Sequence, residues 1–232
     1  MRRDPADAYP QGGTVVAILC GGRSRRMGGR AKATLPLAGT TVLDCVLRST
    51  AALELPCLLV VENSPEDIVL TAALSATGVP QARDRWPDSG PLAGLEAAFV
   101  ATDAQRVLLL ACDLPFLTPD FLMWLLAQAE NDSAVPVDGS GRLQPLCAVF
   151  QATCRPRLLE ALNARELRLQ EFARSIGSRL LPPEAWGSFD PSGKLLTNLN
   201  DPADYAAAQQ WFGSQSLDET ASDRVEHRKN EQ

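Results

Sequence analysis

Short apolar segments that alternate with helical segments constrain the fold of this chain more than any other feature. The apolar segments are "TVVAILC" at residues 14–20, "CLLVVE" at 57–62 and "RVLLLACD" at 106–113. Continuous Val, Leu and Ile are typical of strands that are buried on both faces. Helical patterns at residues 41–53 and 90–103 separate these strands. The alternation predicts an α/β protein with a mostly parallel central sheet and helices on both faces.

Further elements continue this pattern. Capped helices are predicted at residues 64–78 and 118–130, each with proline at its first helical position. Weaker strands are predicted at residues 79–83, at "SAVPV" and at "LQPLCAVF", with "DGSGR" as a turn. Beyond Cys154 the chain is predicted to be mostly helical, and "NLNDPADYAAAQQWF" forms a turn and a last helix.

The length and charge limit the domain organisation and the partners. The chain has 232 residues and a formal net charge of −6. We predict a flexible leader at residues 1–13, one domain at 14–212 and a polar, disordered tail at 213–232. An acidic chain argues against a general binder of nucleic acid or anionic membrane.

Cysteine and histidine usage narrows the possible chemistry. Six cysteines include no C-x-x-C pair, and several lie in apolar segments, so we expect reduced core thiols. The N-terminal residues lack the apolar stretch of a signal peptide, so a cytoplasmic protein is expected. The only histidine is His227. Catalysis is therefore expected to use carboxylates, Lys, Arg, backbone groups or a hard metal.

A basic, glycine-rich segment follows the first predicted strand. Between Gly21 and Lys32 it carries five positive charges and no negative one. It matches neither G-x-x-x-x-G-K-[ST] nor G-x-G-x-x-G. Adjacent glycines still let backbone N–H groups approach a base or phosphate, and Arg and Lys can neutralise a polyphosphate. The alternative interpretation is a solvated basic loop.

Asp113 ends the strand at residues 106–113 and is the second candidate site residue. A carboxylate at this edge suits Mg²⁺, which binds through one or two carboxylates and substrate phosphates. The alternative is that Asp113 only caps the turn before the next helix. If a phosphate oxygen attacks the α-phosphorus of a nucleoside triphosphate, no general base is needed. Positioning and charge neutralisation then carry the reaction.

These residues resemble a known family. "LCGGRSRRMGGRAKATLPLAGTTVLDCVL" is similar to the L-x-G-G-x-x-x-R-M-G-x-x-x-K-x-L signature of the molybdenum cofactor guanylyltransferases, which are MobA-like nucleotidyltransferases. "GPLAG", "CDLPF", "LQPLCAVF" and "NLNDPADY" follow in that family's order, so the resemblance spans residues 14–212. It implies a Rossmann-like three-layer α/β/α fold. It also implies Mg²⁺-dependent transfer of GMP from GTP to the terminal phosphate of Mo-molybdopterin.

The resemblance implies roles for individual residues. The nucleotide-binding residues that it implies are Leu19, Cys20, Gly21, Gly22, Lys32, Asn63, Asp84 and Asp113. The catalytic residues that it implies are Lys32, Arg26 and Asp113, with Asp113 as the magnesium ligand. Asn198 and Asn200 match positions on the pterin side. Because Asn and Asp are common turn formers, each of the four residues Asn63, Asp84, Asn198 and Asn200 has a purely structural alternative.

One departure from the family pattern keeps other functions open. The family usually has Asp before the signature lysine, and this chain has Ala31. The alternatives are a cytidylyltransferase for the same pterin, or a GTP-binding partner protein without transferase activity. The double glycine at Gly21 and Gly22 favours guanine over cytosine by resemblance. The polar tail motivates a further hypothesis, that molybdoenzymes or their insertion factors are partners.

Overall fold

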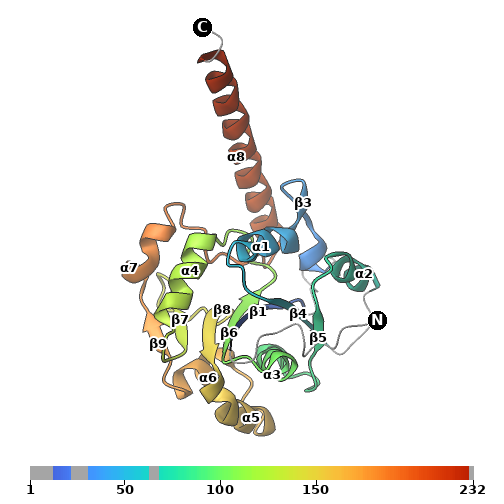
Figure 1. Ribbon diagram of the computed structural model, residues 1–232, viewed down its shortest axis with the longest axis vertical. Helices are drawn as coiled ribbons and strands as arrows, with labels where there is room; N and C mark the ends of the chain where they lie inside the picture. Colours follow the sequence, from blue (N-terminus) through green and yellow to red (C-terminus); the bar gives the residue numbers. More distant parts are fainter. Residues whose placement is uncertain (1–12, 22–30, 63–67, 230–232) are drawn as a thin grey trace.

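A single mixed sheet organises the protein (Figure 1). The computed structural model describes residues 13–21, 31–62 and 68–229, with side chains described as far as residue 215. Seven strands form the sheet in the order β5-β4-β1-β6-β8-β7-β9. Their bounds are β1 Thr14–Leu19, β4 Cys57–Val61, β5 Gln81–Arg83, β6 Arg106–Ala111, β7 Ala134–Pro136, β8 Cys147–Gln151 and β9 Arg179–Leu181.

The strand directions confirm the predicted mostly parallel sheet. β1 pairs in parallel with both β4 and β6, so Leu19 lies between Val60 and Ala111. β4 pairs in parallel with β5, and β7 with β9. β8 is antiparallel to its neighbours β6 and β7. The carboxyl ends of β5, β4, β1 and β6 therefore lie side by side at the same edge of the sheet.

Helices cover both faces of the sheet, as the sequence predicted. Alternate residues of β1 are buried on opposite faces, Val15 and Ala17 on one and Val16 and Ile18 on the other. The face of Val15 packs against α3 (Gly90–Thr102), α5 (Arg155–Asn163) and α6 (Leu169–Ser175). The face of Val16 packs against α1 (Val42–Ala51), α2 (Ile68–Ala76), α4 (Pro119–Gln128) and α7 (Pro183–Trp186). This is the three-layer α/β/α arrangement.

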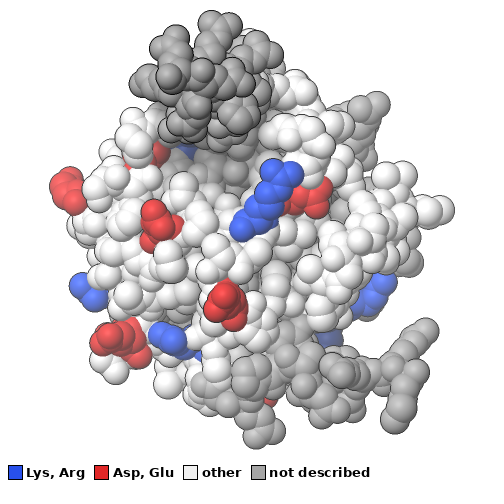
Figure 2. Space-filling model, turned by 45° about the horizontal axis from the view of Figure 1, so that its top comes forward, with Lys and Arg blue, Asp and Glu red and all other residues white. Residues whose placement is uncertain are grey.

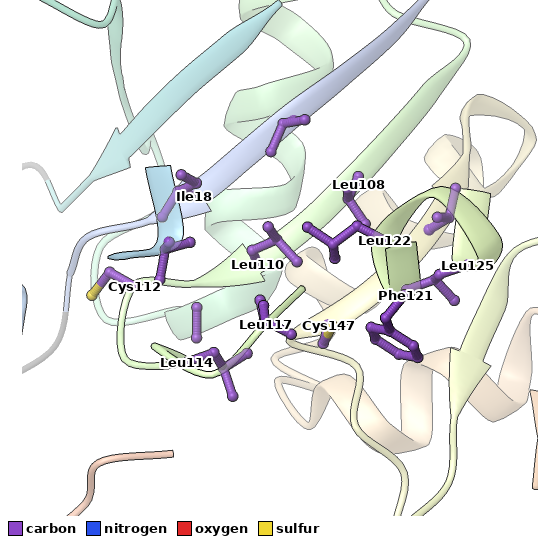
Figure 3. Close-up of a cluster of buried hydrophobic side chains, with 14 of the residues drawn as sticks. Ile18, Leu108, Leu110, Cys112, Leu114, Leu117, Phe121, Leu122, Leu125 and Cys147 are labelled. Carbon is purple, nitrogen blue, oxygen red and sulfur yellow. The ribbon is translucent and has the colours of Figure 1, made fainter. Parts of the chain in front are cut away.

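The core on the α4 side lies beneath the loop that follows β6 (Figure 3). Leu108 and Leu110 of β6 point toward Phe121, Leu122 and Leu125 of α4, and all five side chains are fully buried. Burying such side chains contributes about 1.5 to 3 kcal/mol each. The end of β6, which leads into Asp113, is therefore supported by a closely packed core.

Two helix caps are present, at Thr41 and at the predicted Thr118, while the cap predicted for the helix at residues 64–78 lies outside the described residues. The Thr41 hydroxyl accepts a hydrogen bond from the Asp44 backbone N–H, and the Asp44 carboxylate accepts one from the Thr41 N–H, which forms a capping box. Burial raises the pKa of Asp44, but hydrogen bonds from Thr40 and Thr41 outweigh it and lower that pKa overall. Thr118 caps α4 by accepting a hydrogen bond from the Phe121 N–H.

The last helix, α8 (Pro202–Lys229), differs from the sequence expectation. The sequence predicts a disordered tail from residue 213, but the helix continues through Gly213 and projects from the body (Figure 1). Its first turns are anchored by Trp211 and Phe212, whose rings lie 5.2 and 5.4 Å from the ring of Phe116. Beyond this anchor the chain has no proline to end the helix. Among the described residues, no helix combines the length and the apolar character needed to cross a membrane.

Three short strands were not predicted from the sequence. Strands β2 (Pro36–Leu37) and β3 (Thr40–Thr41) form a hairpin whose two turn residues, Ala38 and Gly39, have φ of 52° and 73°. Positive φ at both positions is the geometry of a type I′ turn. β9 lies at the sheet edge in the segment that was predicted to be mostly helical, and its three residues carry no alternation that would mark a strand.

Candidate functional site

A pocket opens at the edge where β5, β4, β1 and β6 end. Its volume is about 370 Å³. Residues that directly follow these strands line it, namely Asp84, Glu62, Cys20, Gly21, Cys112 and Asp113. Ligands of open α/β sheets bind outside the carboxyl ends of the strands, so the pocket lies where the sequence predicted a ligand edge.

The pocket brings together the predicted site residues that the structure describes. They are Leu19, Cys20, Gly21, Lys32, Asp84, Asp113, Asn198 and Asn200. Gly22, Arg26 and Asn63 lie outside the described residues, as do Arg23, Arg25 and Arg30 of the basic segment. The roles of both groups, the described and the undescribed residues, stay predictions.

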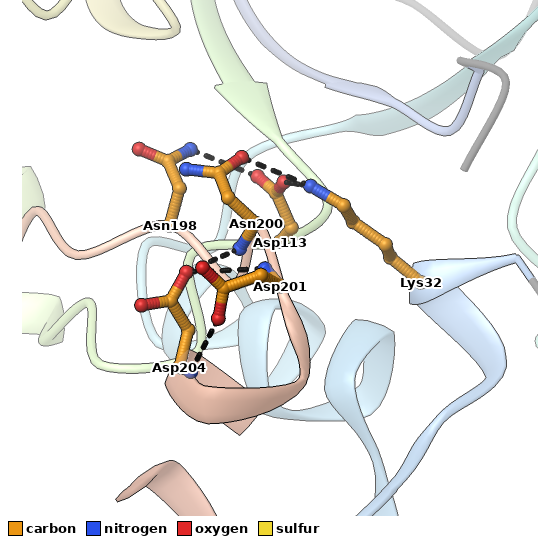
Figure 4. Close-up of polar contacts among 6 residues, drawn as sticks. All are labelled: Lys32, Asp113, Asn198, Asn200, Asp201 and Asp204. Carbon is orange, nitrogen blue, oxygen red and sulfur yellow. Dashed lines mark hydrogen bonds and ion pairs between the residues drawn. The ribbon is translucent and has the colours of Figure 1, made fainter. Parts of the chain in front are cut away.

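Four side chains from three distant segments form a polar cluster at one end of the pocket (Figure 4). Lys32 Nζ lies 2.8 Å from Asp113 Oδ2 and donates a hydrogen bond of 3.1 Å to Asn200 Oδ1. Asn198 Nδ2 donates a hydrogen bond of 2.9 Å to Asp113 Oδ1. Both oxygens of Asp113 are therefore engaged, and the Lys32 and Asp113 side chains are only 18% and 14% exposed. Partial burial strengthens such an ion pair relative to an exposed one.

The residue between Asn198 and Asn200 holds the first side chain at Asp113 and the second at Lys32. Leu199 is fully buried, and its backbone N–H donates to the Asp113 carbonyl oxygen at 3.1 Å. The start of α8 is capped instead by Asp201 and Asp204. Asp204 Oδ2 accepts the Asn200 N–H, and Asp201 Oδ1 accepts the Asp204 N–H. The asparagine side chains are thus not used as helix caps, which was their structural alternative.

In the described part of the chain, the Asp113 carboxylate accepts hydrogen bonds from Lys32 and Asn198 and not from the turn before α4, whose capping was its structural alternative. Thr118 supplies that cap, while the Asp113 carboxylate turns toward Lys32 and Asn198. Lys32 is fixed because it begins a 3₁₀ helix, Lys32–Thr34, whose Ala33 is buried in the core below. The Thr34 hydroxyl closes this turn by donating to the Ala31 carbonyl oxygen at 2.9 Å. Ala31 also lines the pocket.

The other end of the pocket, at β4 and β5, is acidic. Asp84 is 9% exposed, and its backbone N–H donates to the Val61 carbonyl oxygen at 3.1 Å. Glu62 is exposed and lines the same end. The described lining therefore carries one lysine against three carboxylates, Glu62, Asp84 and Asp113. A polyphosphate bound there needs further positive charge.

Sequence reasoning missed Glu62, although a signal was present. Like Asp113, it directly follows a buried strand and so lies at the ligand edge. On the face shown in Figure 2, the described Lys and Arg side chains lie singly among Asp and Glu and form no continuous basic patch.

Cys20, which lines the pocket, is held as a protonated thiol. A hydrogen bond with Cys112, together with burial, raises the pKa of Cys20 well above its ordinary value. Burial also raises the pKa of Cys57 to about 11 and that of Cys154 to about 12. Such thiols stay protonated at neutral pH, and the thiolate is the reactive form. All six cysteines are free and five are buried, which confirms the predicted core thiols.

An ion pair holds the loop that leads from Asp84 into α3. Arg85 pairs with Oε1 of Glu96, whose side chain is 4% exposed on α3. Glu96 Oε2 is buried and accepts no hydrogen bond from the described residues. Arg165 also donates to Ser89 Oγ, at 3.1 Å, in the same loop. Glu96 is thus a positioning residue for the β5 end of the pocket, and the sequence signal was a single Glu in an otherwise apolar helix.

We expect Glu96→Gln to raise the KM for the nucleotide that the sequence predicts as substrate about fivefold and to leave kcat nearly unchanged. The amide keeps the size but loses the charge that holds Arg85, a change of roughly 1 kcal/mol. Steady-state kinetics would measure the split between KM and kcat. Glu171→Gln, which removes a carboxylate from the exposed Arg168–Glu171 pair, is the matched control and should change neither. If Glu96→Gln lowered kcat and also lowered the free energy of unfolding, Glu96 would have a structural role alone.

Sequence comparisons place the chain among known proteins. The MobA-like NTP transferase domain matches residues 16–179. A probable molybdenum cofactor guanylyltransferase of Chloroflexus aggregans is 32% identical over 207 residues, which cover 86% of this chain and 95% of that protein. The probable molybdenum cofactor guanylyltransferase of Carboxydothermus hydrogenoformans is 30% identical over 191 residues, covering 82% and 92%.

Solved structures agree with this placement at the level of the fold. Molybdopterin-guanine dinucleotide biosynthesis protein A from Archaeoglobus fulgidus superimposes with a TM-score of 0.72 at 23% identity, covering 86% of this chain and 99% of that one. A 4-diphosphocytidyl-2C-methyl-D-erythritol synthase from Anaerococcus prevotii superimposes with a TM-score of 0.59 at 12% identity, covering 87% and 99%. Since the domain match alone extends over well more than half of the sequence, the chain belongs to the MobA-like NTP transferase family.

Proposed function

We propose that the protein transfers GMP from GTP to Mo-molybdopterin, releases pyrophosphate and so forms the guanine dinucleotide form of the molybdenum cofactor. Two relatives that are named probable molybdenum cofactor guanylyltransferases match more than four fifths of the chain. The observation that carries the proposal is the polar cluster of Lys32, Asp113, Asn198 and Asn200 at the ligand edge. It offers a cation, a carboxylate and amides in one place, as phosphate chemistry needs.

The reaction requires little proton transfer. A terminal phosphate oxygen of the pterin would attack the α-phosphorus of GTP, while the bond from that phosphorus to the bridging oxygen breaks and pyrophosphate leaves. The attacking oxygen is already anionic, so no general base is required. This fits a chain whose only histidine is His227. Lys32 would bind the triphosphate, and Asn198 and Asn200 would bind on the pterin side, so that the two anions are held in line.

The donor set at Asp113 fits Mg²⁺. The Asp113 carboxylate and Asn200 Oδ1, which both accept hydrogen bonds from Lys32, are hard oxygen ligands, and Mg²⁺ in phosphate sites takes one or two carboxylates along with substrate oxygens. The excess of carboxylates over lysine in the described lining supports the same proposal. When bound, Mg²⁺ would neutralise charge on the triphosphate. The arginines of residues 23–30 would add further positive charge.

The test is pyrophosphate release in the presence of Mg²⁺ and Mo-loaded molybdopterin, with GTP and CTP measured in parallel. We expect release with GTP, none with CTP, and none when the pterin is omitted. Release with CTP but not with GTP would make the protein a cytidylyltransferase. GTP binding without release would make it a binding protein, and Ala31, which lines the pocket where the family usually has Asp, would be the first residue to restore.

A further inference from the structure

Glu62 extends across the backbone of Gly21 at the acidic end of the pocket. A Cβ placed on Gly21 would lie 2.7 Å from Glu62 Cγ and 3.3 Å from Glu62 Oε1. Such a contact is too close for a real Cβ, so the absence of a side chain at Gly21 makes room for Glu62. The glycine that follows β1 and the glutamate that follows β4 therefore form one unit of the pocket wall.

The Glu62 carboxylate is available to a ligand. Its side chain is exposed, it lines the pocket, and it makes no hydrogen bond or ion pair with another residue in the described part of the chain. The neighbouring carboxylate, Asp84, is buried and already engaged within the protein. Glu62 is thus the acceptor at this end that can turn toward a bound molecule.

The position of Glu62 separates it from the phosphate end. β4 lies two strands from β6, so its end is roughly 10 Å from the end that carries Asp113, at about 4.8 Å per strand. An ionised carboxylate only accepts hydrogen bonds, and it repels phosphate. Apolar side chains accompany it, since Leu70 and Pro91 line the same pocket. Acceptor oxygens among apolar groups suit an aromatic base with N–H donors.

We propose that Glu62 is a specificity-determining residue that selects guanine. Guanine presents two adjacent donors, N1–H and the 2-amino group, which match the two oxygens of one carboxylate. Cytosine and adenine present a single amino donor beside a ring-nitrogen acceptor, which a carboxylate repels. The inference rests on the proposed function in that it places GTP in this pocket, with the base toward β4 and the triphosphate toward Lys32.

Inosine triphosphate isolates this contact because it keeps N1–H and lacks the 2-amino group. Binding of GTP and of inosine triphosphate would be measured calorimetrically for the unmodified protein, for Glu62→Gln and for Glu62→Ala. We expect the unmodified protein to prefer GTP by about ten- to a hundredfold, the factor for a hydrogen bond to a charged group. In both variants the preference should fall to within about threefold. Glu130→Gln, an exposed glutamate outside the pocket, should keep it.

The outcomes separate this inference from the proposed function. If the unmodified protein transfers GMP but Glu62→Gln and Glu62→Ala keep the full preference for GTP over inosine triphosphate, the guanine assignment alone is wrong. If no GMP is transferred but the preference for GTP over inosine triphosphate disappears in both variants, Glu62 recognises guanine and the proposed reaction is wrong. Binding of neither nucleotide to the unmodified protein would overturn both. Thermal unfolding of each variant would confirm that the fold is intact.

Discussion

Lys32→Ala should lower kcat/KM for GTP about 100- to 1000-fold, with a higher KM and a lower kcat, because Lys32 is the cation of the described pocket lining. Its ammonium group lies among acceptors, 2.8 Å from Asp113 Oδ2 and 3.1 Å from Asn200 Oδ1, and only 18% of the side chain is exposed. Without it, three carboxylates would face the incoming triphosphate. Both the binding of GTP in the ground state and the stabilisation of the transition state should therefore become weaker.

Steady-state kinetics and GTP binding would be measured together for this variant. Lys194→Ala is the matched control, since Lys194 is partly buried but does not line the pocket, and it should retain full activity. Lys32→Arg should recover part of kcat/KM, because it restores the charge but not the compact shape of the ammonium group. Unchanged GTP binding in Lys32→Ala would show that the triphosphate lies elsewhere.

The sequence predicted the fold where strands are long and buried, and it missed three of the short strands, β2, β3 and β9. β1, β4 and β6 form the centre of the sheet, and their continuous apolar residues left little ambiguity. β9 has three residues at the edge, two of them exposed, so pairing with β7 rather than residue type creates the strand. The continuation of α8 beyond Gly213 was missed because polar composition alone does not distinguish a solvated helix from a disordered segment.

The site could be predicted as an edge of the sheet but not as a set of contacts. Asp113 was found because it ends an apolar strand, whereas Cys20 was found through the family resemblance. The strand-end rule applies equally to Glu62, which was overlooked. The contact between Lys32 and Asp113 joins residues that are 81 positions apart, and no local pattern encodes it. The same holds for Arg85 and Glu96, because only the packing of α3 against the sheet places this carboxylate beneath the loop.

Asp113→Asn should lower Mg²⁺-dependent pyrophosphate release about 1000-fold or more, while cooperative unfolding is retained. The amide keeps the shape, and its oxygen can still accept a hydrogen bond from Lys32, so the packing around β6 survives. It lacks the charge that a hard cation requires. Asp132→Asn is the matched control, since this carboxylate is exposed and outside the pocket. Release would be followed as a function of Mg²⁺ concentration, and an unchanged Mg²⁺ dependence would overturn the metal assignment.

The two Asp113 oxygens are engaged by Lys32 and Asn198 at once. A double variant, Lys32→Ala with Asp113→Asn, therefore separates the role of Asp113 in holding Lys32 from its role in holding Mg²⁺. If Asp113 served only to hold Lys32, then Lys32→Ala with Asp113→Asn would be no slower than Lys32→Ala alone. If Asp113 also holds Mg²⁺, the double variant should be slower than either single one, and its Mg²⁺ dependence should match that of Asp113→Asn. Residues in contact are seldom additive, so the size of the coupling measures how much of the lysine's effect passes through the carboxylate.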